Sequence, residues 1–184
     1  MEAKVIRTLR PNVTREEAIQ KFSEFSLASL YWKVRGGTLQ RIAEAYIPYR
    51  VYHVRFPVRG VQRARFFALD AVDGSLDLFE FNAAPGDAET ISVSTRNHPT
   101  AMLGEARSEE LLRDKILRLV FQQGFFKIGG INLEIERLPG EIYLPYWLGF
   151  YGAPENLRCR VLDAVRRRIE GTRASALFEH WLAA

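Results

Sequence analysis

The chain has 184 residues, of which 47% are hydrophobic and 26% are charged, and its formal net charge is +4. This balance excludes a wholly disordered chain, and the length suits one large domain or two small ones. A single cysteine excludes an internal disulfide, and no apolar run reaches the ~18 residues of a membrane-spanning helix. Residues 1–9 contain no signal sequence, so we expect a cytoplasmic protein without membrane contact.

The first predicted element is a helix that follows Thr14. Thr14 and Glu17 have the spacing of a capping box, in which the two residues bind each other's backbone N–H groups at a helix start. Apolar and small residues at helical spacing then predict one narrow buried face. They are Ala18, Phe22, Phe25 and Ser29. Gly36-Gly37 predicts the turn after this helix.

The rest of the first half is predicted to form antiparallel strands. Residues 38–56 are rich in strand-forming residues, and Pro48 predicts an edge position or a bulge. Residues 63–72 alternate in polarity, and Asp73-Gly74 predicts a hairpin turn into residues 76–81. Residues 1–82 therefore read as a helix packed on an antiparallel meander.

Residues 83–107 are the most polar stretch and are predicted to link two halves. Within them, residues 91–95 alternate and predict a short strand. Linkers of this length are functional loops or crossovers, and we favour a crossover.

The second half, residues 108–184, repeats landmarks of the first half in the same order. Tyr46-Ile47-Pro48-Tyr49 is matched by Tyr143-Leu144-Pro145-Tyr146, and Leu69-Asp70-Ala71-Val72 by Leu162-Asp163-Ala164-Val165. Matches in a fixed order indicate an internal duplication. We therefore expect two copies of one helix-plus-meander unit.

In the second copy, Ser108 is predicted to cap a helix that ends at Gly124. Strands are expected at residues 125–128, 131–137, 142–151 and 158–165. Arg166-Arg167-Arg168 replaces Asp73-Gly74-Ser75, so the last hairpin turn is predicted to be lost and its strand to be short or absent.

The chain ends in a predicted helix that begins near Thr172. Its apolar residues form a one-sided stripe: Ala174, Leu177, Phe178, Trp181 and Leu182. The stripe predicts a helix docked on the core, with a homodimer or partner contact as the alternative.

The segments Thr14-Arg15-Glu16-Glu17-Ala18 and Asp70-Ala71-Val72-Asp73-Gly74 resemble the helix start and the last turn of PepSY domains, which are small bacterial domains. A helix on a curved meander is similar to the cystatin-like fold. Asp163-Ala164-Val165 matches only in part, because Arg167 stands where the glycine would be. The resemblance implies two cystatin-like units, and together with the predicted C-terminal helix they make an α+β protein. It also implies a non-catalytic binding or inhibitory module.

Few residues point to catalysis. None of the histidines has zinc-site spacing, so we expect no metal and no cofactor. They are His53, His98 and His180. Cys159 lies on an apolar strand face and is predicted to be a buried, inert thiol. Asp70 and Asp163 share one repeat position and are predicted to tie strand ends to neighbouring backbone, with a symmetric acid pair as the alternative.

The leading functional prediction is a non-enzymatic binding module for a protein or a small apolar ligand. Rigid aromatic side chains of the two repeated segments would supply the contacts. They are Tyr46, Tyr49, Tyr143, Tyr146 and Trp147. The prediction depends on these side chains being exposed. Residues 144–151 are too apolar for a strand with one solvated face, so they either line a pocket or partner surface or, as we favour, are buried between the two units.

The alternative is single-stranded nucleic-acid binding by the basic and aromatic segment 46–67, because aromatic rings beside arginines hold single strands. Its arginines are Arg50, Arg55, Arg59, Arg63 and Arg65. An enzyme on the concave face of the sheet, with Asp70 or His53 as acid or base, ranks third because no catalytic grouping is evident.

Overall fold

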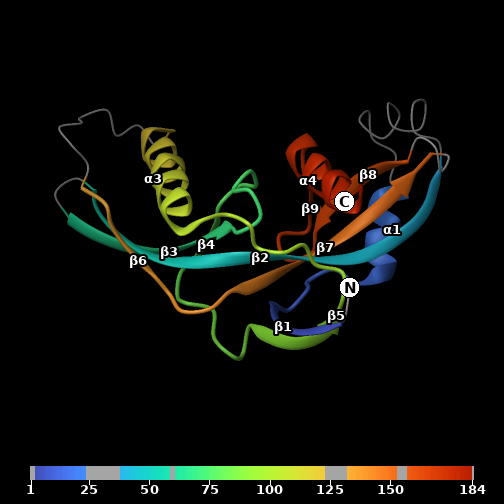
Figure 1. Cartoon of the computed structure of the whole chain (residues 1–184), viewed down its shortest axis with the longest axis horizontal. Helices are drawn as coiled ribbons and strands as arrows, with labels where there is room; N and C mark the ends of the chain where they lie inside the picture. The colour runs from blue at the N-terminus through green and yellow to red at the C-terminus, as the bar shows by residue number, and fades with distance from the viewer. Residues whose placement is uncertain (1–2, 24–37, 59–60, 123–131, 153–156, 184) are drawn as a thin grey trace. The chain divides into compact units, whose positions relative to one another are not determined.

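The computed structural model describes residues 3–23, 38–58, 61–122, 132–152 and 157–183. They form an α+β protein with one large sheet, in the strand order β4-β3-β2-β7-β1-β5 (Figure 1). The longer strands are β1 (Lys4–Leu9), β2 (Leu39–Val58), β3 (Val61–Asp70), β5 (Thr90–Thr95), β7 (Ile142–Tyr151) and β8 (Arg158–Asp163). The short strands are β4 (Phe79–Phe81), β6 (Glu134–Arg137) and β9 (Arg168–Ile169). The helices are α1 (Arg15–Ser23), α3 (Glu105–Gln122) and α4 (Thr172–Ala183). None of these helices combines the length and apolar character needed to cross a membrane.

Two compact units interleave along the chain. Unit 1 comprises Met1–Ile47, Ile91–Pro99 and Tyr143–Ala184, and unit 2 comprises Pro48–Thr90 and Thr100–Ile142. Each unit takes residues from both of the predicted repeats, so compact units and repeats divide the chain differently. Strand β2 contributes its first half to unit 1 and its second half to unit 2.

Unit 1 packs α1 and α4 against the hairpin β7–β8. On one face, Phe22 of α1 lies in a buried cluster with Trp147 and Tyr151. On the other face, the ring of Phe178 in α4 meets the edge of Tyr146, with 5.6 Å between centroids. Every residue of β7 is therefore buried, which explains why its sequence lacks the alternation of a half-exposed strand.

Unit 2 packs α3 against the hairpin β2–β3. Its core cluster contains Tyr52, Val54, Phe56, Phe67, Leu69, Leu112, Ile116 and Leu133. Strand β4 extends the hairpin beyond β3, and β6 pairs with β2. The first-half hairpin is thus covered by the second-half helix, whereas in unit 1 the first-half helix covers the second-half hairpin.

Several predicted local features are confirmed. The Thr14 N–H donates to Glu17 Oε2 at 2.8 Å and the Glu17 N–H donates to Thr14 Oγ1 at 3.3 Å, which is the predicted capping box. Strands β5 and β7 and helix α4 form where they were predicted. Of the α4 stripe, Ala174, Leu177 and Phe178 are buried. Phe25, Ser29, Gly36-Gly37, Gly124 and residues 125–128 lie outside the described residues.

Two local predictions need correction. Pro48 does not lie at an edge, because β2 is an interior strand of the sheet and the Pro48 carbonyl accepts the Ala71 N–H at 2.8 Å; a bulge at Pro48 stays a prediction. Ser108 does not cap α3, because this helix begins at Glu105. The Ser108 hydroxyl instead donates to the Gly104 carbonyl oxygen at 2.9 Å, one helical turn earlier.

Candidate functional site

The aromatic side chains predicted to contact a ligand are all buried. They are Tyr46, Tyr49, Tyr143, Tyr146 and Trp147, with relative exposures between 0% and 7%. The Trp147 indole donates to the Val13 carbonyl oxygen at 3.0 Å, and the Tyr46 hydroxyl donates to the Glu44 carboxylate at 3.1 Å. Burial and the neighbouring Glu44 charge raise the pKa of Tyr46. These rings stabilise the core and lack the exposure that surface binding requires.

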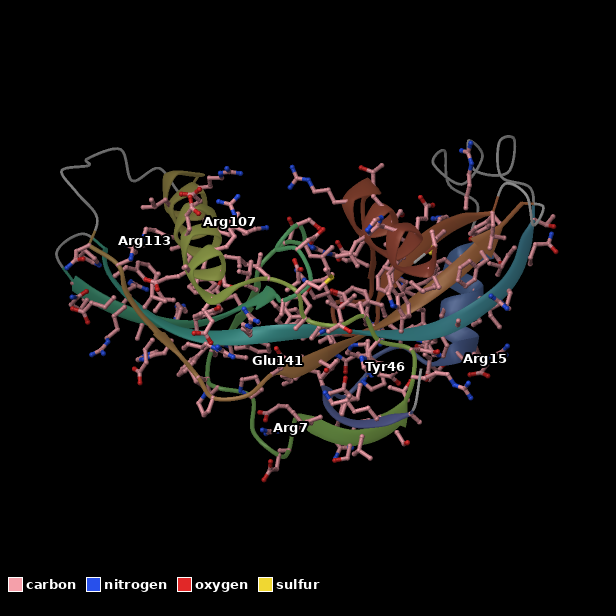
Figure 2. All side chains as sticks on the ribbon, viewed as in Figure 1. Arg7, Arg15, Tyr46, Arg107, Arg113 and Glu141 are labelled. Atoms are coloured by element: carbon pink, nitrogen blue, oxygen red, sulfur yellow. The ribbon has the colours of Figure 1, made fainter. Side chains whose placement is uncertain are left out.

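Arg50 of β2, the first of the predicted nucleic-acid contacts, forms hydrogen bonds to α3 and to the segment that precedes it. Its Nη1 donates to the Leu103 carbonyl oxygen at 2.6 Å and to the Ser108 hydroxyl at 2.8 Å. The carboxylate oxygen Oε1 of Glu141, which is labelled in Figure 2, lies 3.8 Å from the Arg50 Nε. Because Arg50 is only 9% exposed, it serves the core of unit 2 rather than a surface.

The remaining predicted arginines do not share one face. Arg63 and Arg65 lie opposite Phe56 and Val54 on the α3 side of the hairpin, whereas Arg55 lies on the other side. Arg55 pairs with Glu134 at 3.4 Å, and Arg65 pairs with Glu80 at 3.1 Å. Arg59 lies outside the described residues.

Asp70 closes the turn that follows β3. Its Oδ1 accepts the N–H groups of Asp73 and Gly74 at 3.1 and 2.9 Å, and its Oδ2 accepts that of Leu76 at 2.9 Å. Burial raises the pKa of Asp70 above its ordinary value of 3.8, although the three N–H donors oppose this shift. The carboxylate ties a strand end to the backbone, as predicted.

Asp163 plays the same part after β8. Its Oδ1 accepts the N–H groups of Val165 and Arg166 at 2.8 and 2.7 Å, and its Oδ2 accepts the Arg166 guanidinium at 2.7 Å. The prediction that this turn is lost is wrong, because Arg167 adopts the left-handed conformation at φ 60° that Gly74 adopts at φ 72°. The strand that follows, β9, is short, as predicted.

The other candidate residues are Cys159, His98 and His180. Cys159 is buried as predicted, and burial raises the pKa of its thiol to about 12. His98 meets the edge of the Tyr143 ring, and His180 is exposed on α4. Among the described residues, no group of three His, Cys, Asp or Glu side chains could hold a metal ion.

A row of side chains crosses four strands of unit 2, and of its members the sequence pointed to His53, as a possible acid or base, and to Phe66, within the segment 46–67. The register places Glu136 of β6, His53 of β2, Phe66 of β3 and Phe81 of β4 beside one another. The His53 ring stacks on Phe66 with 4.8 Å between centroids, and its Nδ1 lies 3.7 Å from the Glu136 carboxylate. We call this face of the sheet, opposite α3, the open face.

The open face is unusually apolar for a sheet face in contact with solvent. His53, Phe66 and Phe81 are all partly exposed, and the Arg55–Glu134 ion pair borders them. Antiparallel sheets ordinarily place polar residues on the solvent side. A signal was present in the sequence: Phe66 and Phe67 are adjacent in one strand, so their rings must point to opposite faces.

The open face has a counterpart in unit 1. Counted from the end of each Tyr-x-Pro-Tyr segment, Val51 and His53 correspond to Leu148 and Phe150. In unit 1 this face of the hairpin is covered by α4, whose Glu179 carboxylate accepts the Cys159 N–H at 3.1 Å. No helix described in unit 2 covers His53 and Phe66, which are partly exposed, whereas Val51 and Ala68 on the same face are buried.

No protein-family model, curated protein or solved structure matches the chain.

Proposed function

We propose that the chain is a non-enzymatic binding module and that its partner is a protein that lays an amphipathic helix across the open face of unit 2. The carrying observation is the difference between the two hairpins. The face of β7–β8 is covered by α4, whereas the corresponding face of β2–β3 leaves His53 and Phe66 partly exposed. A partner helix would occupy in unit 2 the place that α4 occupies in unit 1.

The chemistry of the open face supports a protein partner. Aromatic residues form its centre, and the Arg55–Glu134 ion pair and the Glu136 carboxylate form its border, which matches the apolar core and polar rim of protein interfaces. Small apolar ligands are usually held in concave sites, whereas this row of side chains stands outward across four strands.

Photocrosslinking tests the proposal. A photoreactive phenylalanine analogue is placed at Phe66 or Phe81 in the native host, with Met102 as the control because it is 80% exposed in the same unit. We expect the same discrete protein adduct from both ring positions and none from Met102. The purified partner should then bind Phe66→Ser at least tenfold more weakly than wild type and Met102→Ser.

Two outcomes contradict the proposal. Adducts at Met102 alone would place the interface elsewhere. Equal affinity of Phe66→Ser and wild type for the partner would show that the open face is not part of the interface. Circular dichroism checks that each variant keeps the wild-type fold, so that a loss of structure is not mistaken for a loss of binding.

Single-stranded nucleic acid is the second candidate. Phe66 and Phe81 lie on neighbouring strands beside Arg55, an arrangement that RNA-binding sheets use to stack bases. Two observations count against nucleic-acid binding. The carboxylates of Glu134 and Glu136 lie on the open face, and unit 2 as a whole has 11 basic and 13 acidic residues, so it would repel phosphates rather than attract them. Steeply salt-dependent binding of an oligonucleotide, lost in Arg55→Glu, would favour this candidate over the first.

We further propose that the two halves are copies of one unit that have exchanged helices. Tyr49 pairs with Asp70 as Tyr146 pairs with Asp163. The Ala71 N–H donates to the Pro48 carbonyl oxygen at 2.8 Å, and the equivalent bond from Ala164 to Pro145 measures 3.1 Å. Each helix covers the hairpin of the other half. A relation to PepSY or cystatin-like domains, a bacterial origin and a cytoplasmic location stay predictions.

A further inference from the structure

Strand β5 (Thr90–Thr95) ends the strand order of the sheet and pairs with β1 on one side only (Figure 1). On its other side, no strand of the described residues pairs with it. From Ile91 to Thr95 this side of β5 is a template for another strand, because the edge of a sheet presents backbone N–H and C=O groups to a new partner.

The other edges of the described sheet carry features that oppose pairing. The part of β3 that extends past β4 carries Arg63 and Arg65, and three of the four residues of β6 are charged. Strands β4 and β9 have only three and two residues, and each contains a charge. Such short and charged edges prevent edge-to-edge association. Strand β5 reads Thr-Ile-Ser-Val-Ser-Thr and has no charge, proline or glycine.

We propose that β5 pairs with β5 of a second copy of this chain in an antiparallel, twofold-symmetric dimer. Centred on Val93, the strand is complementary to itself: Val93 faces Val93, Ile91 faces Thr95, and Ser92 faces Ser94 of the second copy. β-branched residues thus meet on one side and hydroxyls on the other, and both kinds of pair stabilise antiparallel sheets. Val93 already packs against the cluster of Ile6, Tyr46 and Tyr143, which anchors the strand.

Charges near β5 do not oppose this pairing. In the proposed register Arg96 faces Thr90, so the two copies of Arg96 lie about 20 Å apart at ~3.3 Å per residue. Lys4 and Arg7 lie on β1, the strand that neighbours β5 within the sheet. In the proposed dimer they would lie about 14 Å from the β1 strand of the second copy, which is three strand spacings away. Both separations exceed the screening length of about 8 Å at physiological salt.

Two double variants with matched geometry test the pairing. Ser92 and Ser94 are exposed, so neither substitution disturbs the core. Ser92→Lys with Ser94→Lys places lysines opposite lysines, whereas Ser92→Glu with Ser94→Lys places opposite charges together. Sedimentation velocity over a hundredfold range of concentration measures the dimer dissociation constant of each purified protein.

We expect a dimeric wild type, a dissociation constant at least tenfold higher for the lysine–lysine variant, and a value within threefold of wild type for the glutamate–lysine variant. A wild type that stays monomeric throughout overturns the proposal. Equal weakening in both variants, or in neither, also overturns it, because the proposed register would then be absent. None of these outcomes depends on the open face of unit 2.

Discussion

The turn after each buried aspartate depends on one residue in the left-handed conformation. Gly74 adopts it without a side chain, and a Cβ there would lie 2.6 Å from Leu111 Cδ1. Arg167 adopts it with a side chain, at a cost of about 1–2 kcal/mol for a non-glycine residue. Its guanidinium pairs with Glu17 at 2.8 Å, so the side chain links the β8–β9 turn to the start of α1. The Thr14 N–H and this guanidinium lower the pKa of Glu17.

Glycine at position 167 should therefore be better tolerated than alanine. Arg167→Gly and Arg167→Ala both lose the ion pair with Glu17, but only glycine relieves the backbone strain. We expect the glycine variant to be more stable than the alanine variant by about 1 kcal/mol in urea unfolding. Gly74→Ala is the reverse control and should destabilise the protein. Equal stability of the two Arg167 variants would contradict this account of the turn.

At the scale of elements, the contact between α1 and β7 is close enough to require a glycine. A Cβ on Gly149 would lie 3.0 Å from the Phe22 ring, and that ring is only 2% exposed. The Tyr151 hydroxyl also donates to the Phe22 carbonyl oxygen at 3.0 Å, which fixes the end of the helix. The helix therefore has little freedom to move away from the strand.

Gly149→Ala should destabilise the protein by about 1–3 kcal/mol, although alanine suits a strand better than glycine does. Phe22→Leu replaces the opposing ring with a smaller side chain, so the methyl group added at position 149 should then destabilise the protein less. The double variant is thus expected to lose less stability than the sum of the single losses, as measured by chemical denaturation. Strictly additive losses would show that the two residues do not oppose each other.

Local sequence signals predicted where the helices and strands lie better than they predicted which helix packs on which hairpin. The Thr14–Glu17 capping box and the turn at Gly74 depend on neighbouring residues, so short patterns were sufficient. The hairpin that α1 covers could not be predicted, because a helix with one apolar face can pack on the apolar face of either hairpin. The burial of Tyr49 and Trp147 depends on that pairing, and for this reason aromatic residues predicted for a surface lie in the core.

At the scale of the whole molecule, neither half of the chain contains a complete unit. Unit 1 needs α1 together with β7–β8, and unit 2 needs α3 together with β2–β3. The stability of each unit therefore depends on segments far apart in the sequence.

Separating the chain in the loop after β4 tests this dependence. Fragments 1–86 and 87–184 each contain one helix of the exchanged pair and the hairpin that the other helix covers. We expect neither fragment alone to unfold cooperatively by circular dichroism, and the mixture to recover the transition of the intact chain as a one-to-one complex. A cooperative transition in fragment 1–86 alone would mean that α1 can pack on its own hairpin, which contradicts the exchange.

The packing of α1 on β7 also has a consequence for synthesis. Phe22 and Trp147 pack together although about 125 residues separate them, and at ~5–20 residues per second the ribosome needs roughly 6–25 s to make that interval. During this time the apolar side of α1 has emerged while its strand has not yet been translated. Newly made chains are thus exposed to chaperones and to misassociation until the last quarter of the protein leaves the ribosome.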